Sequence, residues 1–170
     1  MAKSDFSTGG FAAEYGNALS GVFDVRFRNG NDQKRENRFK LGVLGIDFST
    51  EGPFKKGNSS YLVNYRYSTL GLLTSMGIYL VGERVNHNFQ DLSFNLVFKS
   101  KNNKSIQTLF GMGGLSEEHY EPVTEAQNRK IGEANQWEDR RKPANMGAVG
   151  YTWTYLLNQK SFLKTVVAVV

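Results

Sequence analysis

The chain contains no cysteine and only three prolines among its 170 residues. The absence of cysteine excludes a disulfide framework and any metal site built on thiolates. No apolar run approaches the length of about 20 residues that a transmembrane helix needs, and the mean hydropathy of -0.45 agrees with this. These absences leave open a membrane β-barrel, whose strands are apolar on only one face.

Aromatic residues make up 13% of the chain, and 18 glycines accompany them. Together with the scarcity of proline, this composition favours an all-β protein. The net charge of +5 raises the question of a nucleic-acid-binding protein. The basic residues are spread through turns and polar strand faces without forming a compact stripe, so we expect no nucleic-acid partner.

Apolar and polar residues alternate with a period of two in several segments, which is typical of strands with one apolar and one polar face. The clearest apolar rows contain Tyr61, Val63, Tyr65 and Tyr67; Phe94, Leu96 and Phe98; and Tyr151, Trp153 and Tyr155. Residues 38–54 hold two apolar series of opposite phase, one ending at Val43 and the other beginning at Leu44. Either a bulge in one long strand or a tight hairpin explains this change of phase.

Short and long connections alternate along the chain. Residues 55–58, 101–104 and 158–161 read as short turns, whereas residues 70–88 and 115–143 read as long connections, the first of which fits a short helix near 70–76. Outer-membrane barrels have short turns on the periplasmic side and long loops on the outer side. The same alternation requires residues 38–54 to turn back on themselves, which favours a hairpin near Leu44–Gly45.

The segment Gly9–Gly30, GGFAAEYGNALSGVFDVRFRNG, begins with small residues suited to tight turns and continues as a strand from Val22 to Arg28. The run AEYGNALSGVFDVRFRNGN resembles the end of the plug domain of TonB-dependent outer-membrane receptors, in the variant found in Bacteroidetes-type bacteria. In that family, a Tyr-Gly segment and a small-residue turn precede the last plug strand, and the barrel follows. The runs EGPF at 51–54 and NYRYST at 64–69 resemble the first barrel strands of the same group.

This resemblance implies an all-β fold: a partial antiparallel transmembrane β-barrel, about seven strands of a larger barrel of about 22, preceded by the last strand of a plug domain. Residues 1–32 would be the C-terminal end of the plug and residues 33–170 the truncated N-terminal part of the barrel. Met1–Asp5 has no apolar region of a signal peptide, and Thr165–Val170 stops inside an apparent strand. We therefore expect a fragment that lacks its signal peptide.

The resemblance also implies a function. Receptors of this family take up an iron chelate, cobalamin, an oligosaccharide or a peptide across the outer membrane of Gram-negative bacteria. The implied partners are outer-membrane lipid, the nutrient ligand of the full-length receptor, and the TonB energising complex. The last of these would be reached only through the N-terminal part that this sequence does not include.

Two groups of site residues follow. Asp24, Arg26 and Arg28 share the polar face of the predicted plug strand, where they would pair with carboxylates of the barrel wall; a plain half-exposed strand is the alternative. The ten residues of the apolar rows are predicted to face lipid. We expect no enzyme activity, cofactor or metal, because His87 and His119 fall in predicted loops without characteristic ligand spacing, and no nucleophile or phosphate-binding motif is present.

A soluble β-sandwich that binds a ligand or carbohydrate is the alternative to a membrane protein. It would explain the alternation, and Tyr151, Trp153 and Tyr155 would then stack on sugar rings. It explains less well the alternating loop lengths and the single apolar face on every strand.

Overall fold

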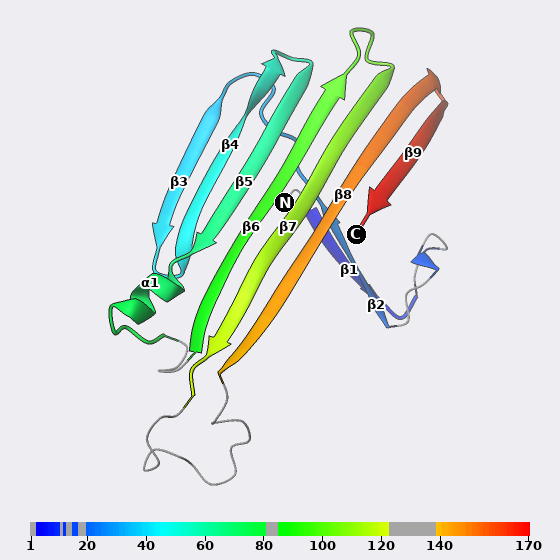
Figure 1. The fold of residues 1–170 in the computed structure, drawn as a ribbon. Coiled ribbons are helices and arrows are strands. Elements are labelled where there is room, and N and C mark those ends of the chain that lie inside the picture. Colours follow the sequence, from blue (N-terminus) through cyan, green and yellow to red (C-terminus); the bar gives the residue numbers. More distant parts are fainter. Residues whose placement is uncertain (1–2, 11, 13–14, 17–19, 81–84, 123–138) are drawn as a thin grey trace.

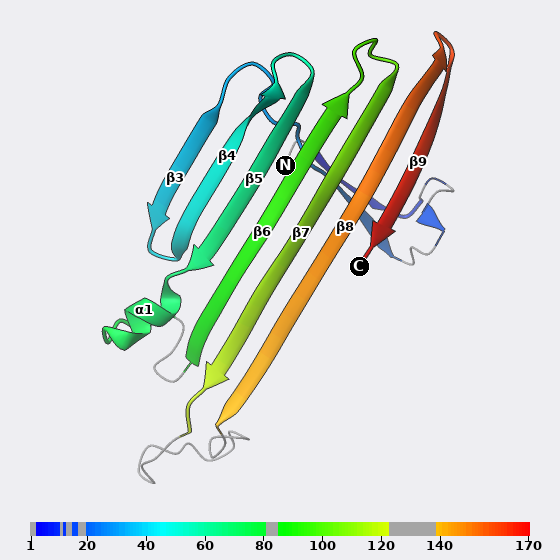
Figure 2. The same ribbon diagram turned by 45° about the horizontal axis from the view of Figure 1, so that its top comes forward.

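The computed structural model describes residues 3–10, 12, 15–16, 20–80, 85–122 and 139–170. Two antiparallel sheets account for most of this part of the chain, one of two strands and one of seven. Figures 1 and 2 both show the smaller sheet behind the larger one, crossing it obliquely. The prediction of an all-β protein is confirmed.

The smaller sheet pairs β1 (Lys3–Thr8) with β2 (Gly21–Arg26). The larger sheet is a meander in which each strand pairs with its neighbours in sequence. Its strands are β3 (Glu36–Gly42), β4 (Gly45–Lys55), β5 (Ser59–Ser68), β6 (Val85–Lys99), β7 (Ser105–Tyr120), β8 (Arg140–Asn158) and β9 (Ser161–Val169). Within the described residues β3 and β9 are its free edges, so this sheet does not close into a barrel.

The helix α1 (Leu70–Ser75) connects β5 to β6, where the sequence suggests a short helix. In the described part of the chain, no helix is long and apolar enough to cross a bilayer.

The connections of the larger sheet alternate between its two ends. The turns after β4, β6 and β8 are short and lie at one end. At the other end lie α1, the two-residue turn after β3, the end of β7 and the start of β8 (Figure 1). Between β3 and β4 the chain turns at residues 43–44, and Gly42 pairs directly with Gly45. The hairpin prediction for residues 38–54 is therefore confirmed, and the bulge of β4 lies instead at Phe54, between Pro53 and Lys55.

Two predicted loops are shorter in the structure than the sequence suggests. β6 begins at Val85, and the predicted connection 115–143 is strand up to Tyr120 and again from Arg140. His87 and His119 therefore lie in strands, and their assignment to loops was wrong. The strands are longer than predicted because polar side chains also pair across them, as Glu118 does with Lys142. Such pairs extend a strand without producing an apolar period in the sequence. The middle of the predicted loop, residues 123–138, lies outside the described residues.

The N-terminal region holds one strand more than predicted. β1 pairs with β2 over its whole length, and the rings of Phe6 and Phe23 lie 6.4 Å apart. β2 ends at Arg26, so Arg28 belongs to the segment after the strand rather than to the strand itself. Residues 11, 13–14 and 17–19 of the predicted small-residue turn lie outside the described residues.

The register of the larger sheet places all ten residues of the apolar rows on one face, which we call the aromatic face. Cross-strand partners lie on the same face of a sheet. The successive pairs Val63↔Phe94, Phe94↔Gly111 and Gly111↔Val149 therefore show which residues of β5 to β8 share this face. Near the short turns, the Phe54 ring stacks on Phe98 at 5.3 Å. The opposite face, which we call the polar face, carries mainly Ser, Asn and charged residues on β4 to β6.

Little of the apolar surface is buried. Among the described residues, Leu70 and Val97 are the buried hydrophobic ones, whereas the buried polar ones are Glu51, Ser59, Ser60, Ser68 and Asn95. On the aromatic face, Tyr65, Tyr67, Phe98, Tyr151, Trp153 and Tyr155 are exposed. The described part of the chain thus lacks the apolar core that a self-contained domain of this size needs.

Candidate functional site

Residues 27–31, which we call the linker, carry the chain from β2 across the polar face of the larger sheet, and residues 32–35 then lead into β3. The Phe27 ring lies 6.0 Å from that of Phe110 on β7. Further along, the Asn95 side chain on β6 donates a hydrogen bond of 2.9 Å to the carbonyl oxygen of Arg28. Figures 1 and 2 show the same path behind the strands. The linker therefore touches the sheet on the side away from the aromatic face.

An ion pair between Arg28 and Glu51 of β4 anchors the linker, and we call it the clamp. Arg28 Nη1 donates to Glu51 Oε2 at 2.6 Å, and Nη2 donates to Oε1 at 2.5 Å. This two-pronged geometry is the strongest arrangement of a guanidinium on a carboxylate. Glu51 accepts a third hydrogen bond from the backbone N–H of Asn31, which lies 2.9 Å from Oε2.

Burial makes the clamp a specific contact rather than a loose surface pair. The Glu51 side chain is only 7% exposed, and that of Arg28 is 35% exposed. A buried carboxylate is costly unless a cation and hydrogen-bond donors satisfy it, so Glu51 requires the linker in place. The hydrogen bond to Glu51 is also the main reason why the pKa of Arg28 is raised above its ordinary value.

Gly30 passes so close to β5 that a side chain has no room. A Cβ added at Gly30 would overlap the backbone carbonyl of Tyr61. Glycine at this position lets two backbones approach, and Gly30 is buried there. This contact sets the distance between the linker backbone and the sheet.

The residues after Gly30 turn the chain into β3. The Asn31 side-chain oxygen accepts hydrogen bonds from the backbone N–H groups of Gln33 (2.9 Å) and Lys34 (3.2 Å), which forms an Asx-type turn. Its side-chain amide donates to Glu36 at 2.9 Å. The Asp32 carbonyl accepts the N–H of Gly57 at 2.8 Å, which ties the same segment to the turn after β4.

Of the three residues predicted at the plug–barrel contact, Arg28 is the one that contacts β4. Arg26 instead donates to Asp24 on its own strand, with Nη2 at 2.6 Å and Nε at 3.0 Å from Oδ2. Hydrogen bonding from Arg26 is the largest reason why the pKa of Asp24 is lowered, and the charge of Lys164 contributes weakly in the same direction. Whether these residues form a plug–barrel contact stays a prediction.

Sequence reasoning did not assign Glu51 and Asn95 to the site, although the sequence carries a signal for each. Both are polar residues in the middle of predicted strands, and both lie on the phase opposite the apolar rows. Glu51 is 23 positions from Arg28 and Asn95 is 67, so the register of the sheet is needed to bring them together.

At the other end of the polar face, charged groups pair among themselves. Arg66 binds Asp91 through Nε at 2.8 Å and Nη2 at 2.7 Å, and its guanidinium lies over the Phe89 ring. His87 Nε2 lies 3.5 Å from Glu118. Across the described ranges, no three His, Cys, Asp or Glu side chains are grouped so that they could hold a metal ion.

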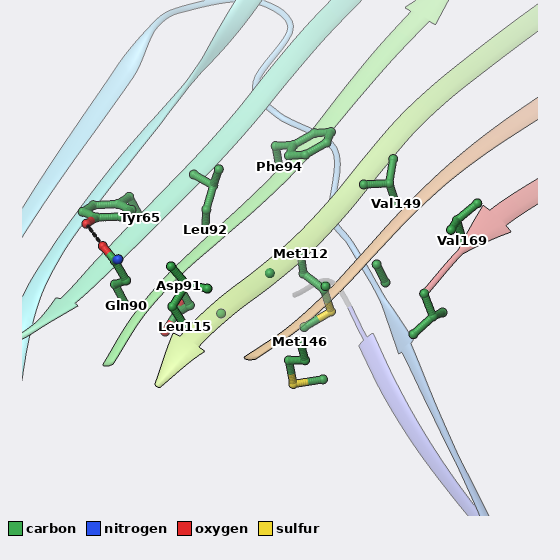
Figure 3. Close-up of a pocket in the computed structure, with 15 residues that line it drawn as sticks. Tyr65, Gln90, Asp91, Leu92, Phe94, Met112, Leu115, Met146, Val149 and Val169 are labelled. Atoms are coloured by element: carbon green, nitrogen blue, oxygen red, sulfur yellow. Dashed lines mark hydrogen bonds between the residues drawn. The ribbon is translucent and has the colours of Figure 1, made fainter. Parts of the chain in front are cut away.

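The aromatic face contains an open hollow of ≈ 620 Å³ near the end of β9. Gly113 and Gly147 pair across β7 and β8 at its floor. Figure 3 shows Tyr65 and Leu92 on one side and Val149 on the other, with the Tyr65 hydroxyl bonded to Gln90 at 2.8 Å. The lining of the hollow is mostly apolar, and its carboxylate residue, Asp91, is paired with Arg66.

Comparisons of the chain with protein-family models, with curated proteins and with solved structures find no match. The geometry by itself defines an open antiparallel sheet. Among the residues that the structure describes, nothing covers its apolar face, and an N-terminal segment is clamped to the other face.

Proposed function

We propose that the chain is a segment of the wall of an outer-membrane β-barrel together with the end of its plug. It would belong to a TonB-dependent receptor that takes up a nutrient such as an iron chelate, cobalamin, an oligosaccharide or a peptide. The observation that carries the proposal is the separation of the two faces. All ten apolar-row residues share one face, and the linker with its clamp occupies the other.

The aromatic face suits a lipid environment. Its exposed Tyr, Trp and Phe side chains would each contribute roughly 25 cal/mol per Å² of apolar surface removed from water. β6, β7 and β8 contain 15, 16 and 19 residues. About 9–11 residues suffice for a tilted strand to cross a bilayer, so these strands would also extend beyond it. Tyr and Trp near the short turns would sit at the membrane–water interface.

The polar face suits the interior of a plugged barrel, which is polar in this class of protein. Adjacent strands bring opposite charges side by side: Lys40 pairs with Asp47, Asp47 with Arg66, and Arg66 with Asp91. A row of alternating charge tolerates water and a polar plug but not acyl chains. The linker crosses this same face, as the end of a plug inside a barrel would.

A soluble β-sandwich gains less support. In a sandwich, the row Phe94, Leu96 and Phe98 would be sealed against a second sheet. The other sheet of the described chain, β1–β2, lies on the opposite side, because the linker that follows it contacts Phe110 and Asn95. Phe98 remains 42% exposed.

Under this proposal the chain performs no catalysis. Uptake would depend on loops that bind the nutrient and on release of the plug by an energised inner-membrane complex. The chain would contribute the site at which the plug end is fastened to the first strands of the wall. Partners would be outer-membrane lipid on the aromatic face and the remaining plug and wall on the polar face.

Quenching of tryptophan fluorescence by brominated lipids tests the orientation of the sheet. The chain has two tryptophans, so a Trp137→Phe variant leaves Trp153 of β8 as the reporter. After refolding into vesicles, bromine on the acyl chains should quench Trp153, because its ring lies on the aromatic face.

The matched control moves the reporter by one residue. In the Trp137→Phe background, Trp153→Tyr together with Thr152→Trp places the indole on the polar face of the same strand. This variant should be quenched much less by brominated acyl chains. Equal quenching of the two reporters, or stronger quenching at position 152, would contradict the proposed orientation.

A further inference from the structure

The linker contains the dipeptide Asn29–Gly30 between the two residues that bind Glu51. An asparagine followed by glycine is the sequence most prone to deamidation, because glycine does not hinder attack of its own backbone nitrogen on the asparagine side chain. That attack requires the backbone at Asn29 to rotate until the Gly30 nitrogen reaches the side-chain carbonyl carbon. Freedom of the backbone at this dipeptide therefore controls the reaction.

The structure removes this freedom on both sides. Before the dipeptide, Arg28 is held by Glu51 through its guanidinium and by Asn95 through its carbonyl oxygen. After it, the Asn31 N–H is bound to Glu51. Between them, Gly30 is buried against the Tyr61 carbonyl, so its peptide plane has little space to turn.

We infer that Asn29 is a deamidation site that the Arg28–Glu51 clamp protects, so that it reacts when the linker leaves the sheet. In the released linker, the Gly30 nitrogen attacks the Asn29 side-chain carbonyl carbon, a C–N bond forms, and ammonia leaves with the former amide nitrogen. One water molecule then opens the resulting succinimide to aspartate or isoaspartate. No oxidant or reductant takes part, and the inference holds whether or not the aromatic face lies in a membrane.

The two products differ in their ability to return to the sheet. Aspartate keeps a side-chain oxygen in the position from which Asn29 accepts a bond of 3.4 Å from Asn95. Isoaspartate instead routes the backbone through the side chain and adds one atom between Arg28 and Gly30. That atom changes the spacing between Arg28, which is bound to Glu51, and Gly30, which is packed closely on the Tyr61 carbonyl. Chains converted to isoaspartate should therefore keep the linker detached.

The test follows deamidation of the full chain, folded in detergent micelles at neutral pH, by peptide mass spectrometry and by enzymatic methylation of isoaspartate. The reference is the same chain unfolded in urea. Deamidation at Asn29 should be at least about tenfold slower in the folded chain, since it proceeds only from the open linker. Glu51→Gln, which removes the charge of the clamp, should accelerate it by about tenfold.

Two further variants keep the result decisive. Asp91→Asn removes a carboxylate of the same face that pairs with Arg66 and does not touch the linker, so it should leave the rate unchanged. Asn95→Ala loosens the linker with the clamp intact and should give a smaller acceleration if Glu51→Gln does not fold. Circular dichroism identifies the folded variants. Equal rates in the folded and unfolded chain, or the same rate in the folded parent and in both linker variants, would overturn the inference.

Discussion

Replacing Gly30 by alanine probes how closely the linker is held to the sheet. The added methyl group would overlap the Tyr61 carbonyl, which belongs to the backbone of a paired strand and cannot yield as a flexible side chain would. The linker must therefore move outward. That movement lengthens the bonds that Arg28 and Asn31 make to Glu51.

The size of the effect follows from the contacts at stake. Hydrogen bonds to charged groups contribute roughly 1.5–3 kcal/mol each when buried. The partial exposure of Arg28 lowers this contribution. With the Asn95 bond, opening of the linker should cost about 3–5 kcal/mol. Overpacking by one methyl group typically costs about 1–3 kcal/mol, so Gly30→Ala should reduce protection of the linker by roughly five- to 150-fold.

Hydrogen exchange of the Asn31 N–H measures this directly, because that group is bound to Glu51 at 2.9 Å in the closed linker. Amide groups in β6 and β7 report whether the sheet itself stays intact. Gly10→Ala is the matched control, because a Cβ at Gly10 meets no atom within 4 Å. It should change neither set of amides by more than about 0.5 kcal/mol.

An unchanged exchange rate at Asn31 in the Gly30→Ala chain would refute the reasoning, since it would mean that the linker does not rest on Tyr61. Loss of protection throughout β6 and β7 would refute it in another way. In that case, the linker would be part of one cooperative unit with the sheet rather than a segment that opens alone.

Three other changes have defined outcomes. Val97→Ala removes two methyl groups from a side chain that is 2% exposed and should lower the free energy of unfolding by roughly 1–3 kcal/mol, measured by urea titration in micelles. Arg26→Gln should raise the pKa of Asp24 toward its ordinary value, measured by carboxyl-carbon NMR. Because that pKa is depressed in the folded state, the pair stabilises β2 above the ordinary pKa, and this contribution is lost as the pH falls through the folded value. Gly150→Ala should displace the Phe110 ring, which covers Gly150, and so change the ring-proton shifts of Phe110.

The strands were predictable wherever one face is apolar. Tyr61 to Tyr67 and Phe94 to Phe98 show the two-residue period because their partners on adjacent strands form a continuous apolar surface. The hairpin at residues 43–44 was also predictable, because the change of apolar phase required a bulge or a turn and the alternation of short and long connections required a turn. The apolar period is local in sequence, whereas the choice of a hairpin depended on the order of connections along the chain.

Features that depend on register were not predictable. The segment around Glu117 and His119 has no apolar period that would predict a strand. It is a strand because these residues pair with Pro143 and Arg141, and that pairing is known only once β7 and β8 are aligned. For the candidate site, the polar phase of the predicted strand Val22–Arg28 indicated Arg28, although β2 ends at Arg26. Its partner Glu51 emerges only from the path of the linker over the sheet. A charged side chain shows in the sequence that it needs a partner, but not which one.

If the larger sheet is part of a closed barrel, as proposed above, its number of strands restricts how that barrel can close. Seven antiparallel strands leave β3 and β9 pointing in the same direction. Joining these two edges to each other would create a parallel pair, which a wholly antiparallel cylinder does not contain. Any such cylinder that includes this sheet must insert an odd number of additional strands between β9 and β3, and their total is then even.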